Sequence, residues 1–354
     1  MEKETWLIYG AYGYTGELIA REAAKRGWSP TLAGRNPEKL KPLSEELELG
    51  MRAFPLDDNT ADYLSGISLV LNCAGPFSKT SKPLIQACLA AGVHYLDITG
   101  EIEVFEEAHA LSGQAKKAGT IICPGVGFDV IPTDCTALKL KEAMPDAITL
   151  SLGFDSDSGI SRGTYKTMIQ GLGSGSTIRK DGKLVSVPIG SQRRSINYGR
   201  GSRSSMGIPW GDVSTAHYTT GIENISAWIP VPRTAAAGAL LFSGFRPVLS
   251  SAPVQKMLNN WVDRRITGPD EELRSNSPAY IWGEVRNAAG LIKVARIRTA
   301  NVYDLTIYGA LETVHRLLKD PFEGGSYTPA MLFGSNFVED LPGSGTFEID
   351  AFYP

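Results

Sequence analysis

Short apolar runs alternate with amphipathic, charged stretches over the first third of the chain. Six apolar runs lie at 6–9, 30–34, 52–56, 67–72, 93–98 and 120–123. Four stretches between them have helical composition and spacing, at 17–26, 38–48, 81–91 and 103–117. Strands that alternate with helices in this way predict a parallel sheet with helices packed on it, and hence an α/β fold.

The pattern changes after residue 129. Strands of alternating polarity are predicted at 148–154 and 225–231, and two hairpins turn at 180–183 and at 289–290. Helices are predicted at 131–144, 163–171, 235–249, 254–265, 300–318 and 328–339. Mixed strands with long connections predict a second, α+β domain that is built on a mostly antiparallel sheet.

Composition narrows the class of protein. A length of 354 residues favours two domains, and 42% apolar with 21% charged residues is typical of soluble globular proteins. A net charge of −3 gives no electrostatic footprint for nucleic acid. We find no signal peptide and no apolar run of transmembrane length. The four cysteines form no C-x-x-C pair, which favours reduced thiols in the cytoplasm and no metal site.

The first apolar run leads into three glycines at three-residue spacing, Gly10, Gly13 and Gly16. A strand, a glycine turn and a helix are typical of a dinucleotide-binding turn, whose helix N-terminus holds the pyrophosphate. The spacing departs from the usual G-x-G-x-x-G, and a purely structural turn is the alternative. Six residues of this turn are expected to contact the cofactor: Gly10, Tyr12, Gly13, Tyr14, Thr15 and Gly16.

The second apolar run ends in Arg35 and Asn36, where NAD-binding proteins carry an acid that binds the ribose 2′-OH. The nearest acid, Glu38, lies beyond Pro37. An arginine suits the 2′-phosphate of NADP through its charge and its bidentate fork. The alternative is an ordinary surface arginine at a strand end. We therefore expect Arg35 and Asn36 to contact the cofactor, and we expect that cofactor to be NADP (NADPH).

The remaining cofactor contacts are expected where later strands end, because ligands of a doubly wound sheet lie at the carboxyl ends of its strands. Small and polar residues follow the fourth, fifth and sixth apolar runs. The residues assigned to the cofactor there are Asn72, Cys73, Ala74, Gly75, Pro76, Thr99, Gly100, Gly127, Phe128 and Asp129.

Five motifs occur in order over this region: Gly-Ala-Tyr-Gly-Tyr-Thr-Gly, Ala-Gly-Arg-Asn, Asn-Cys-Ala-Gly-Pro-Phe, Tyr-Leu-Asp-Ile-Thr-Gly-Glu and Gly-Val-Gly-Phe-Asp-Val-Ile-Pro-Thr-Asp. Together they resemble the saccharopine dehydrogenase-like NADP-binding family, and within it the trans-acting enoyl reductase branch. Segments 161–164, 209–213, 220–225 and 327–330 resemble that branch too. The resemblance implies an NADP-binding oxidoreductase with a Rossmann-type first domain.

These observations predict three parts of the chain. Residues 1–129 are the dinucleotide-binding domain, and residues 130–325 are an α+β domain for substrate binding or dimerisation. Residues 326–354 are expected to return to the first domain, which the resemblance also favours.

Catalytic residues carry a weaker signal than cofactor residues. The adjacent Tyr165 and Lys166 form a pair that can supply a proton, although neighbours on a helix point in different directions. His217 lies near a motif of the second domain, whereas His94, His109 and His315 are expected to be packed or exposed. The candidates are therefore Tyr165, Lys166 and His217.

Four arginines between Pro188 and Pro209 form a basic run: Arg193, Arg194, Arg200 and Arg203. We expect a solvated, mobile loop. The alternative is a patch that receives an acyl carrier protein or a phosphopantetheine thioester.

Three functions remain open from the sequence. The first, ranked by resemblance, is NADPH-dependent reduction of an activated C=C bond in an enoyl thioester or a lipid or polyketide-type substrate. The second is a C–N oxidoreductase of the saccharopine or lysine dehydrogenase type, which needs arginines for a carboxylate. The third is a non-catalytic nucleotide-binding or lipid-associated protein, supported only by the apolar stretch 235–249. A homodimer is the base-rate expectation.

Overall fold

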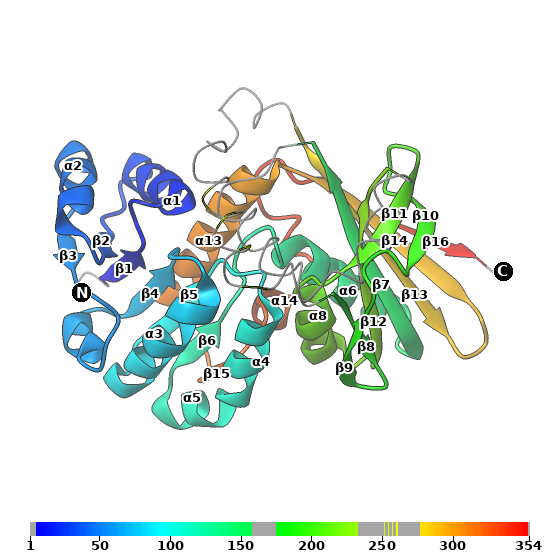
Figure 1. Cartoon of the computed structure of the whole chain (residues 1–354), viewed down its shortest axis with the longest axis horizontal. Helices are drawn as coiled ribbons and strands as arrows, with labels where there is room; N and C mark the ends of the chain where they lie inside the picture. The colour runs from blue at the N-terminus through cyan, green and yellow to red at the C-terminus, as the bar shows by residue number, and fades with distance from the viewer. Residues whose placement is uncertain are drawn as a thin grey trace. The chain divides into compact units, whose positions relative to one another are not determined.

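The computed structural model of the chain describes residues 5–157, 175–232 and 277–352, together with positions 251, 254, 257 and 260. By their contacts, the residues divide into two compact units (Figure 1). The first unit comprises Met1–Ile131 and Leu305–Leu332, and the second comprises Pro132–Asp304 and Phe333–Pro354.

The first unit is built on a seven-stranded sheet in which all strand pairs are parallel. In sheet order the strands are β15 (Gly325–Ser326), β6 (Ile121–Cys123), β5 (His94–Asp97), β4 (Leu69–Asn72), β1 (Trp6–Tyr9), β2 (Thr31–Gly34) and β3 (Met51–Ala53). The chain order reverses between β1 and β4, which places a topological switch point at the end of β1. The predicted Rossmann-type sheet is confirmed.

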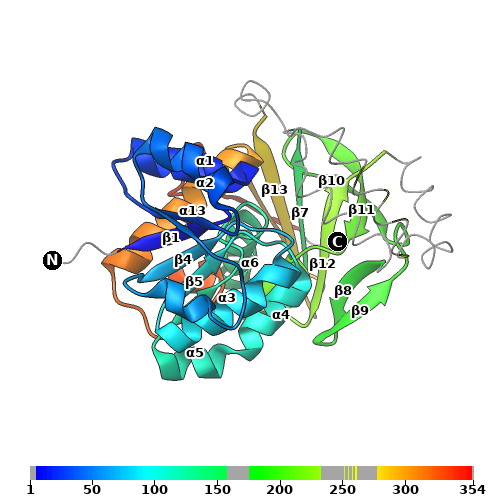
Figure 2. The same ribbon diagram turned by 60° about the vertical axis from the view of Figure 1, so that its left-hand side comes forward.

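Helices lie on both faces of this sheet (Figure 2). They are α1 (Tyr14–Lys25), α2 (Pro37–Leu47), α3 (Phe77–Ala91), α4 (Ile102–Ala110), α5 (Ser112–Ala118) and α13 (Val302–Lys319), with the 3-10 turn η1 (Thr60–Leu64) before β4. One buried cluster joins Leu84 of α3, Ala108 of α4 and Ala115 of α5 to Val70 of β4 and Tyr95 of β5. The strands are apolar on both faces because helices cover both.

The second unit is built on a nine-stranded, mostly antiparallel sheet. Its main path is β10 (Arg193–Asn197), β11 (Ser202–Ile208), β12 (Asn224–Pro230), β7 (Ala147–Ser156), β13 (Ala279–Asn287), β14 (Ile292–Thr299) and β16 (Glu348–Phe352), and the hairpin β8 (Ser176–Lys180) and β9 (Lys183–Val187) pairs with β12. Among the described strands of this sheet, only β12 and β7 pair in parallel. The described helices are α6 (Ile131–Ala143), α8 (Asp212–Thr220) and the short α14 (Pro329–Phe333), which straddles the boundary between the units. Leu140 of α6 and Ala216 of α8 pack on Leu152 and Ile225 of the sheet.

The hairpin β10–β11 folds back over the other face of this sheet. β10 is separated from β13 by three strands in sheet order, yet the guanidinium carbon of Arg194 lies 4.9 Å from the ring centre of Trp282 on β13. The turn of the hairpin reaches β14, because Arg296 Nε donates to the carbonyl oxygen of Asn197 at 2.8 Å. A buried aromatic cluster of Tyr198, Trp228 and Trp282 lies beneath the hairpin.

Several element predictions need correction. The stretch 103–117 is two helices, because Leu111 ends α4 and begins α5. The helix predicted at 328–339 is only α14, and Gly334 with a positive φ follows it. The basic run is a hairpin of the sheet and not a mobile loop. The helices predicted at 163–171 and 235–249 lie outside the described residues, as does most of 254–265.

The division by contacts differs from the predicted domains in the last third of the chain. Residues 305–325 group with the first unit, where α13 packs and β15 adds a seventh strand beside β6. Residues 333–354 group with the second unit, where β16 pairs with β14. The three predicted domain ranges therefore stay predictions.

Candidate cofactor site

The glycine turn is hydrogen-bonded to the end of β2. The N–H groups of Gly10 and Ala11 both donate to Ala33 O, at 2.8 and 3.1 Å. Gly10 adopts a φ of +84°, and a Cβ there would lie 2.8 Å from the Cβ of Ala74. A Cβ on Gly16 would overlap the carbonyl oxygen of Gly10. The two glycines are thus required where the turn meets the β4–α3 loop and where α1 packs on the turn.

The N-terminus of α1 is open to an anion. Its N-cap is Gly13, which supplies no side-chain acceptor. The acidic residue in its first turn, Glu17, is paired with Arg21, whose Nη2 lies 2.8 Å from Glu17 Oε1. The positive end of the helix dipole and its first N–H groups suit the pyrophosphate of a dinucleotide.

Arg35 is exposed at the end of β2 and lines a shallow hollow of about 430 Å³ with Asn36, Pro37 and Glu38. Among the described residues, no carboxylate forms an ion pair with Arg35. Asn36 Oδ1 caps α2 by accepting from the N–H groups of Glu38 and Lys39. Because Asn36 occupies these N–H groups, Arg35 is the group of this hollow that suits a 2′-phosphate, through its charge and its bidentate fork.

Sequence reasoning missed Lys39, which lies in the first turn of α2. Its Nζ is 5.8 Å from the ring centre of Tyr12, and the Tyr12 ring packs against Gly34 so closely that a Cβ there would lie 2.6 Å from it. Tyr12 therefore lies between the glycine turn and the hollow. The sequence did contain a signal for Lys39, since it is a cation only four residues after Arg35, in the first turn of the helix predicted there.

Asn72 at the end of β4 is a buried anchor for the loop that follows it. Its Oδ1 accepts from Ala74 N at 3.0 Å, and its Nδ2 donates to Thr80 Oγ1 and Tyr95 OH, both at 3.1 Å. The predicted contact residues Cys73, Ala74, Gly75 and Pro76 form this loop. Burial raises the pKa of the Cys73 thiol well above its usual range, so it is a thiol and not a thiolate.

Asp97 extends the same buried network below the site. Tyr95 OH donates to Asp97 Oδ2 at 2.8 Å, and Asp97 Oδ1 accepts from the N–H groups of Thr99 and Gly125. Burial raises the pKa of Asp97 to about 6, although these hydrogen bonds oppose the rise. The backbone N–H and the hydroxyl of Thr99 both form internal hydrogen bonds, since the N–H donates to Asp97 and Oγ1 accepts from Glu101 N.

Gly127 and Phe128, two further predicted residues, both contact Thr306, which lies far away in the chain. Phe128 N donates to Thr306 Oγ1 at 3.0 Å, and a Cβ on Gly127 would lie 2.9 Å from Thr306 Cγ2. Thr306 belongs to α13 and is separated from Phe128 by 178 positions. No local pattern in the sequence could have identified it.

The carboxylate of Asp129 lies against Gly100, where a Cβ would be 3.0 Å from Asp129 Oδ2. Burial raises the pKa of Asp129 to about 7. A carboxyl group that titrates near neutral pH can carry a proton in catalysis. The structure therefore brings together Gly10, Gly13, Gly16 and Ala74 at one place and Gly100 with Asp129 at another.

The predicted catalytic residues receive no support as a group. Tyr165 and Lys166 lie outside the described residues. His217 lies on α8 in the second unit, where its Nδ1 is 2.9 Å from the carbonyl oxygen of Ile222 and its ring packs on Tyr218. These contacts give His217 a structural role at the end of α8. Over the described ranges, no group of three His, Cys, Asp or Glu side chains could hold a metal ion.

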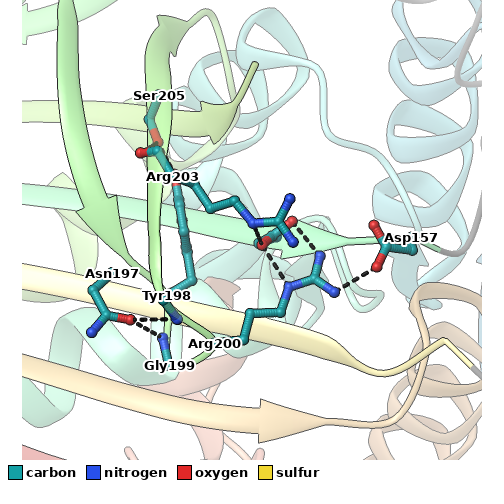
Figure 3. A network of polar contacts seen from close by, with 9 residues as sticks. Asp157, Asn197, Tyr198, Gly199, Arg200, Arg203 and Ser205 are labelled. Atoms are coloured by element: carbon teal, nitrogen blue, oxygen red, sulfur yellow. Dashed lines mark hydrogen bonds and ion pairs between the residues drawn. The ribbon is translucent and has the colours of Figure 1, made fainter. Parts of the chain in front are cut away.

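The arginines of β10–β11 are largely engaged within the second unit (Figure 3). Arg200 forms two hydrogen bonds with Asp155, at 2.7 and 2.6 Å, and a third with Asp157. Arg203 Nε lies 3.5 Å from Asp155, whose side chain is 3% exposed. Arg194 pairs with Glu284 at 2.7 Å. Arg193 is exposed at the start of the hairpin and has no carboxylate partner among the described residues, but its Nε donates to the carbonyl oxygen of Gly190 at 2.7 Å.

Comparisons with known proteins show what the chain is similar to. Residues 6–123 match the family model of the saccharopine dehydrogenase NADP binding domain. A saccharopine dehydrogenase-like oxidoreductase of Arabidopsis thaliana is 31% identical over 203 residues, which cover 49% of this chain and 44% of that protein. A Mycobacterium tuberculosis protein named as a trans-acting enoyl reductase is 29% identical over 188 residues, or 48% of this chain and 44% of that protein. The matches thus span about half the length of these relatives.

The fold is shared with a solved structure over its whole length. Apo saccharopine dehydrogenase (L-Glu forming) from Saccharomyces cerevisiae matches with a TM-score of 0.68 and 11% identity, covering 99% of this chain and all of that one. None of the helices in the described ranges has the length and apolarity to cross a membrane. The resemblance seen in the sequence is confirmed for the first third of the chain: residues 6–123 match the saccharopine dehydrogenase NADP binding domain, and this region is similar to saccharopine dehydrogenase-like oxidoreductases.

Proposed function

We propose that the chain is an NADPH-dependent oxidoreductase that reduces the activated C=C bond of an enoyl substrate, either a thioester or a lipid or polyketide-type molecule. The observation that carries the cofactor assignment has two parts. The N-terminus of α1 has no side-chain cap, and the exposed Arg35 lines the hollow at the end of β2. The NADP-binding domain model and the oxidoreductase names of the relatives support the same class. The enoyl substrate is supported by the name of the M. tuberculosis relative.

When bound, NADPH would supply the hydride that the β-carbon of the enoyl group accepts. The glycine turn and the uncapped N-terminus of α1 would hold the pyrophosphate, and Arg35 would bind the 2′-phosphate. Asn72 and Thr306 hold the loops that border the cofactor. Asp129, whose pKa burial raises to about 7, would donate the proton that the α-carbon needs, which balances the reduction.

The second candidate is a C–N oxidoreductase, and the saccharopine dehydrogenase model match favours it. Its substrate would carry carboxylates, which arginines usually bind. Arg194 and Arg200 are already paired with Glu284 and Asp155, so β10–β11 offers little free positive charge for that purpose. This pairing is why the C=C reduction ranks first.

Arg203 also lies near the carboxylate of Asp155, so the proposed acyl-carrier partner would depend mainly on the exposed Arg193. A cytoplasmic location stays our proposal, since Cys73, Cys88, Cys123 and Cys135 are all free thiols. The name of the Arabidopsis relative describes it as mitochondrial. A homodimer and a non-catalytic role both stay open to experiment.

Calorimetric titration of the purified chain with NADPH and then NADH tests the proposal. We expect micromolar binding of NADPH and much weaker binding of NADH. NADPH oxidation is then followed with an enoyl thioester and, separately, with a 2-oxo acid plus an amino acid. Turnover of only the second pair would establish the C–N alternative, and binding without turnover of either would favour the non-catalytic one.

A further inference from the structure

The carboxylate of Glu101 joins two loops at the carboxyl edge of the first sheet. Its Oε1 accepts from Phe77 N at 2.9 Å, and its Oε2 accepts from Ser78 N at 2.8 Å. By position Glu101 is the N-cap of α4, yet its side chain caps α3, which begins 24 residues earlier. One side chain thus ties the N-terminal ends of α3 and α4 together.

This contact makes the N-terminus of α3 different from the N-terminus of α1, because only α3 is capped by a carboxylate. A carboxylate that accepts two N–H groups at a helix N-terminus gains from charge-assisted hydrogen bonds and from the helix dipole. The N-terminus of α3 therefore already holds an anion that belongs to the protein. The N-terminus of α1 has no side-chain cap and stays available for the cofactor pyrophosphate.

The loop that Glu101 anchors is the one that faces the glycine turn. Ala74 packs against Gly10, and the carbonyl oxygen of Cys73 would lie 4.0 Å from a Cβ on Gly13. Asn72 holds the first half of this loop, and Glu101 holds the end of it. In a doubly wound sheet the dinucleotide crosses the switch point, so its second half lies on the β4 side.

We propose that Glu101 is a positioning residue for the nicotinamide half of NADPH. It acts through the backbone of Phe77 and Ser78, by fixing the wall that the β4–α3 loop forms. The adenosine half of NADPH would bind at a different place, in the hollow that Arg35 lines between β2 and α2. The inference rests on the proposed NADPH-dependent function and names a residue that serves one half of its site.

The experiment compares two ligands on three full-length proteins. NADPH contains both halves of the cofactor, whereas adenosine 2′,5′-bisphosphate contains only the half that Arg35 serves. Their dissociation constants are measured for the wild type, for Glu101→Gln and for Glu103→Gln. Glu103 is exposed in the first turn of α4 and serves as the matched control. Thermal unfolding of each protein reports on folding.

We expect Glu101→Gln to weaken NADPH about tenfold, because an amide replaces one charged acceptor with a donor. Binding of the bisphosphate should stay within about twofold, and Glu103→Gln should match the wild type. Glu101→Asp, which keeps the charge but shortens the side chain, should restore part of the NADPH affinity even if the glutamine variant folds poorly.

Two results would overturn the inference while leaving the proposed function intact. One is an equal loss of both ligands in Glu101→Gln, which would make the contact a general structural cap. The other is unchanged NADPH binding. A wild-type protein that binds neither ligand would instead refute the NADPH-dependent function, and the role of Glu101 would fall with it.

Discussion

Gly10 and Ala74 meet where the glycine turn touches the β4–α3 loop, with only 2.8 Å between a Cβ on Gly10 and the Cβ of Ala74. Gly10 also has a positive φ of +84°. The close approach of β1 and β4 ends therefore depends on the absence of a side chain at this position. The same approach creates the edge at which the cofactor is proposed to bind.

Gly10→Ala should lower both stability and NADPH affinity. The matched control is Gly27→Ala, since Gly27 has a similar φ of +75° but no atom within 4 Å of an added Cβ. Backbone strain costs both variants about 1–2 kcal/mol, and overlap with Ala74 adds about 1–3 kcal/mol for Gly10 alone. Urea unfolding measures the difference, and equal losses in the two variants would show that the contact with Ala74 is unimportant.

Arg35→Asp should weaken NADPH by at least about tenfold, because charged hydrogen bonds contribute about 1.5–3 kcal/mol each. NADH, which lacks the 2′-phosphate, should bind as before. Lys41→Gln is the control, since Lys41 is an exposed cation on α2, the helix that follows Arg35. Calorimetric titration measures both cofactors. An equal loss for NADPH and NADH would make Arg35 a structural residue and remove the main support for NADP selectivity.

Local patterns identified the glycine turn between β1 and α1, and long-range contacts explain what the patterns missed. The three glycines, the apolar strand before them and the arginine after β2 are all local features, and each lies where the sequence predicts it. Glu101 was assigned no role, because its partners on α3 lie in another part of the chain. Thr306 was missed for the same reason at a larger separation.

The basic hairpin shows a different limit. Strand β10 buries only Ile196, so its polar and apolar residues do not alternate clearly. The glycines and arginines of the hairpin are typical of a loop, and the sequence therefore predicted one. Its stability comes from Glu284 and Asp155, which lie 90 and 45 positions from their arginine partners. By contrast, the hairpin β13–β14 was predicted, since both strands alternate clearly and Gly290 marks the turn.

Asp129 makes the free energy of unfolding fall as the pH rises, whereas a carboxylate held in an ion pair makes it rise with pH. Its pKa rises from about 3.8 in the unfolded chain to about 7 in the folded protein, so the folded state binds the proton more tightly. The stabilisation is complete below the unfolded value and is lost as pH rises toward 7. Asp97, with a pKa of about 6, contributes the same sign over a shorter range.

Asp129→Asn should therefore flatten the fall of stability between pH 6 and 7, where Asp97 contributes less. If Asp129 donates the proton, wild-type kcat should decline above about pH 7, and the variant should lose most of its activity at every pH. Asp58→Asn, at an exposed acid of the same unit, is the control. A variant that keeps the wild-type pH profile would exclude Asp129 as the proton donor.

Arg194 and Arg193 are neighbours on β10 with different surroundings, and their alanine variants separate stability from partner binding. Arg194→Ala should cost about 2 kcal/mol, because it removes the contact with the Trp282 ring and leaves Glu284, 19% exposed, without its cation. Arg193→Ala should cost less, about 0.5–1 kcal/mol, because it removes only the hydrogen bond from Arg193 Nε to the carbonyl oxygen of Gly190.

The same pair tests the acyl-carrier proposal. A carrier that docks on the basic hairpin needs exposed positive charge, so Arg193→Ala should raise KM for a carrier-bound enoyl substrate while leaving KM for the free thioester unchanged. Raised salt should have the same selective effect, since exposed charges are screened. If carrier-bound substrate is turned over equally well by Arg193→Ala and the wild type, the hairpin is a structural element of the second sheet and the carrier docks elsewhere or not at all.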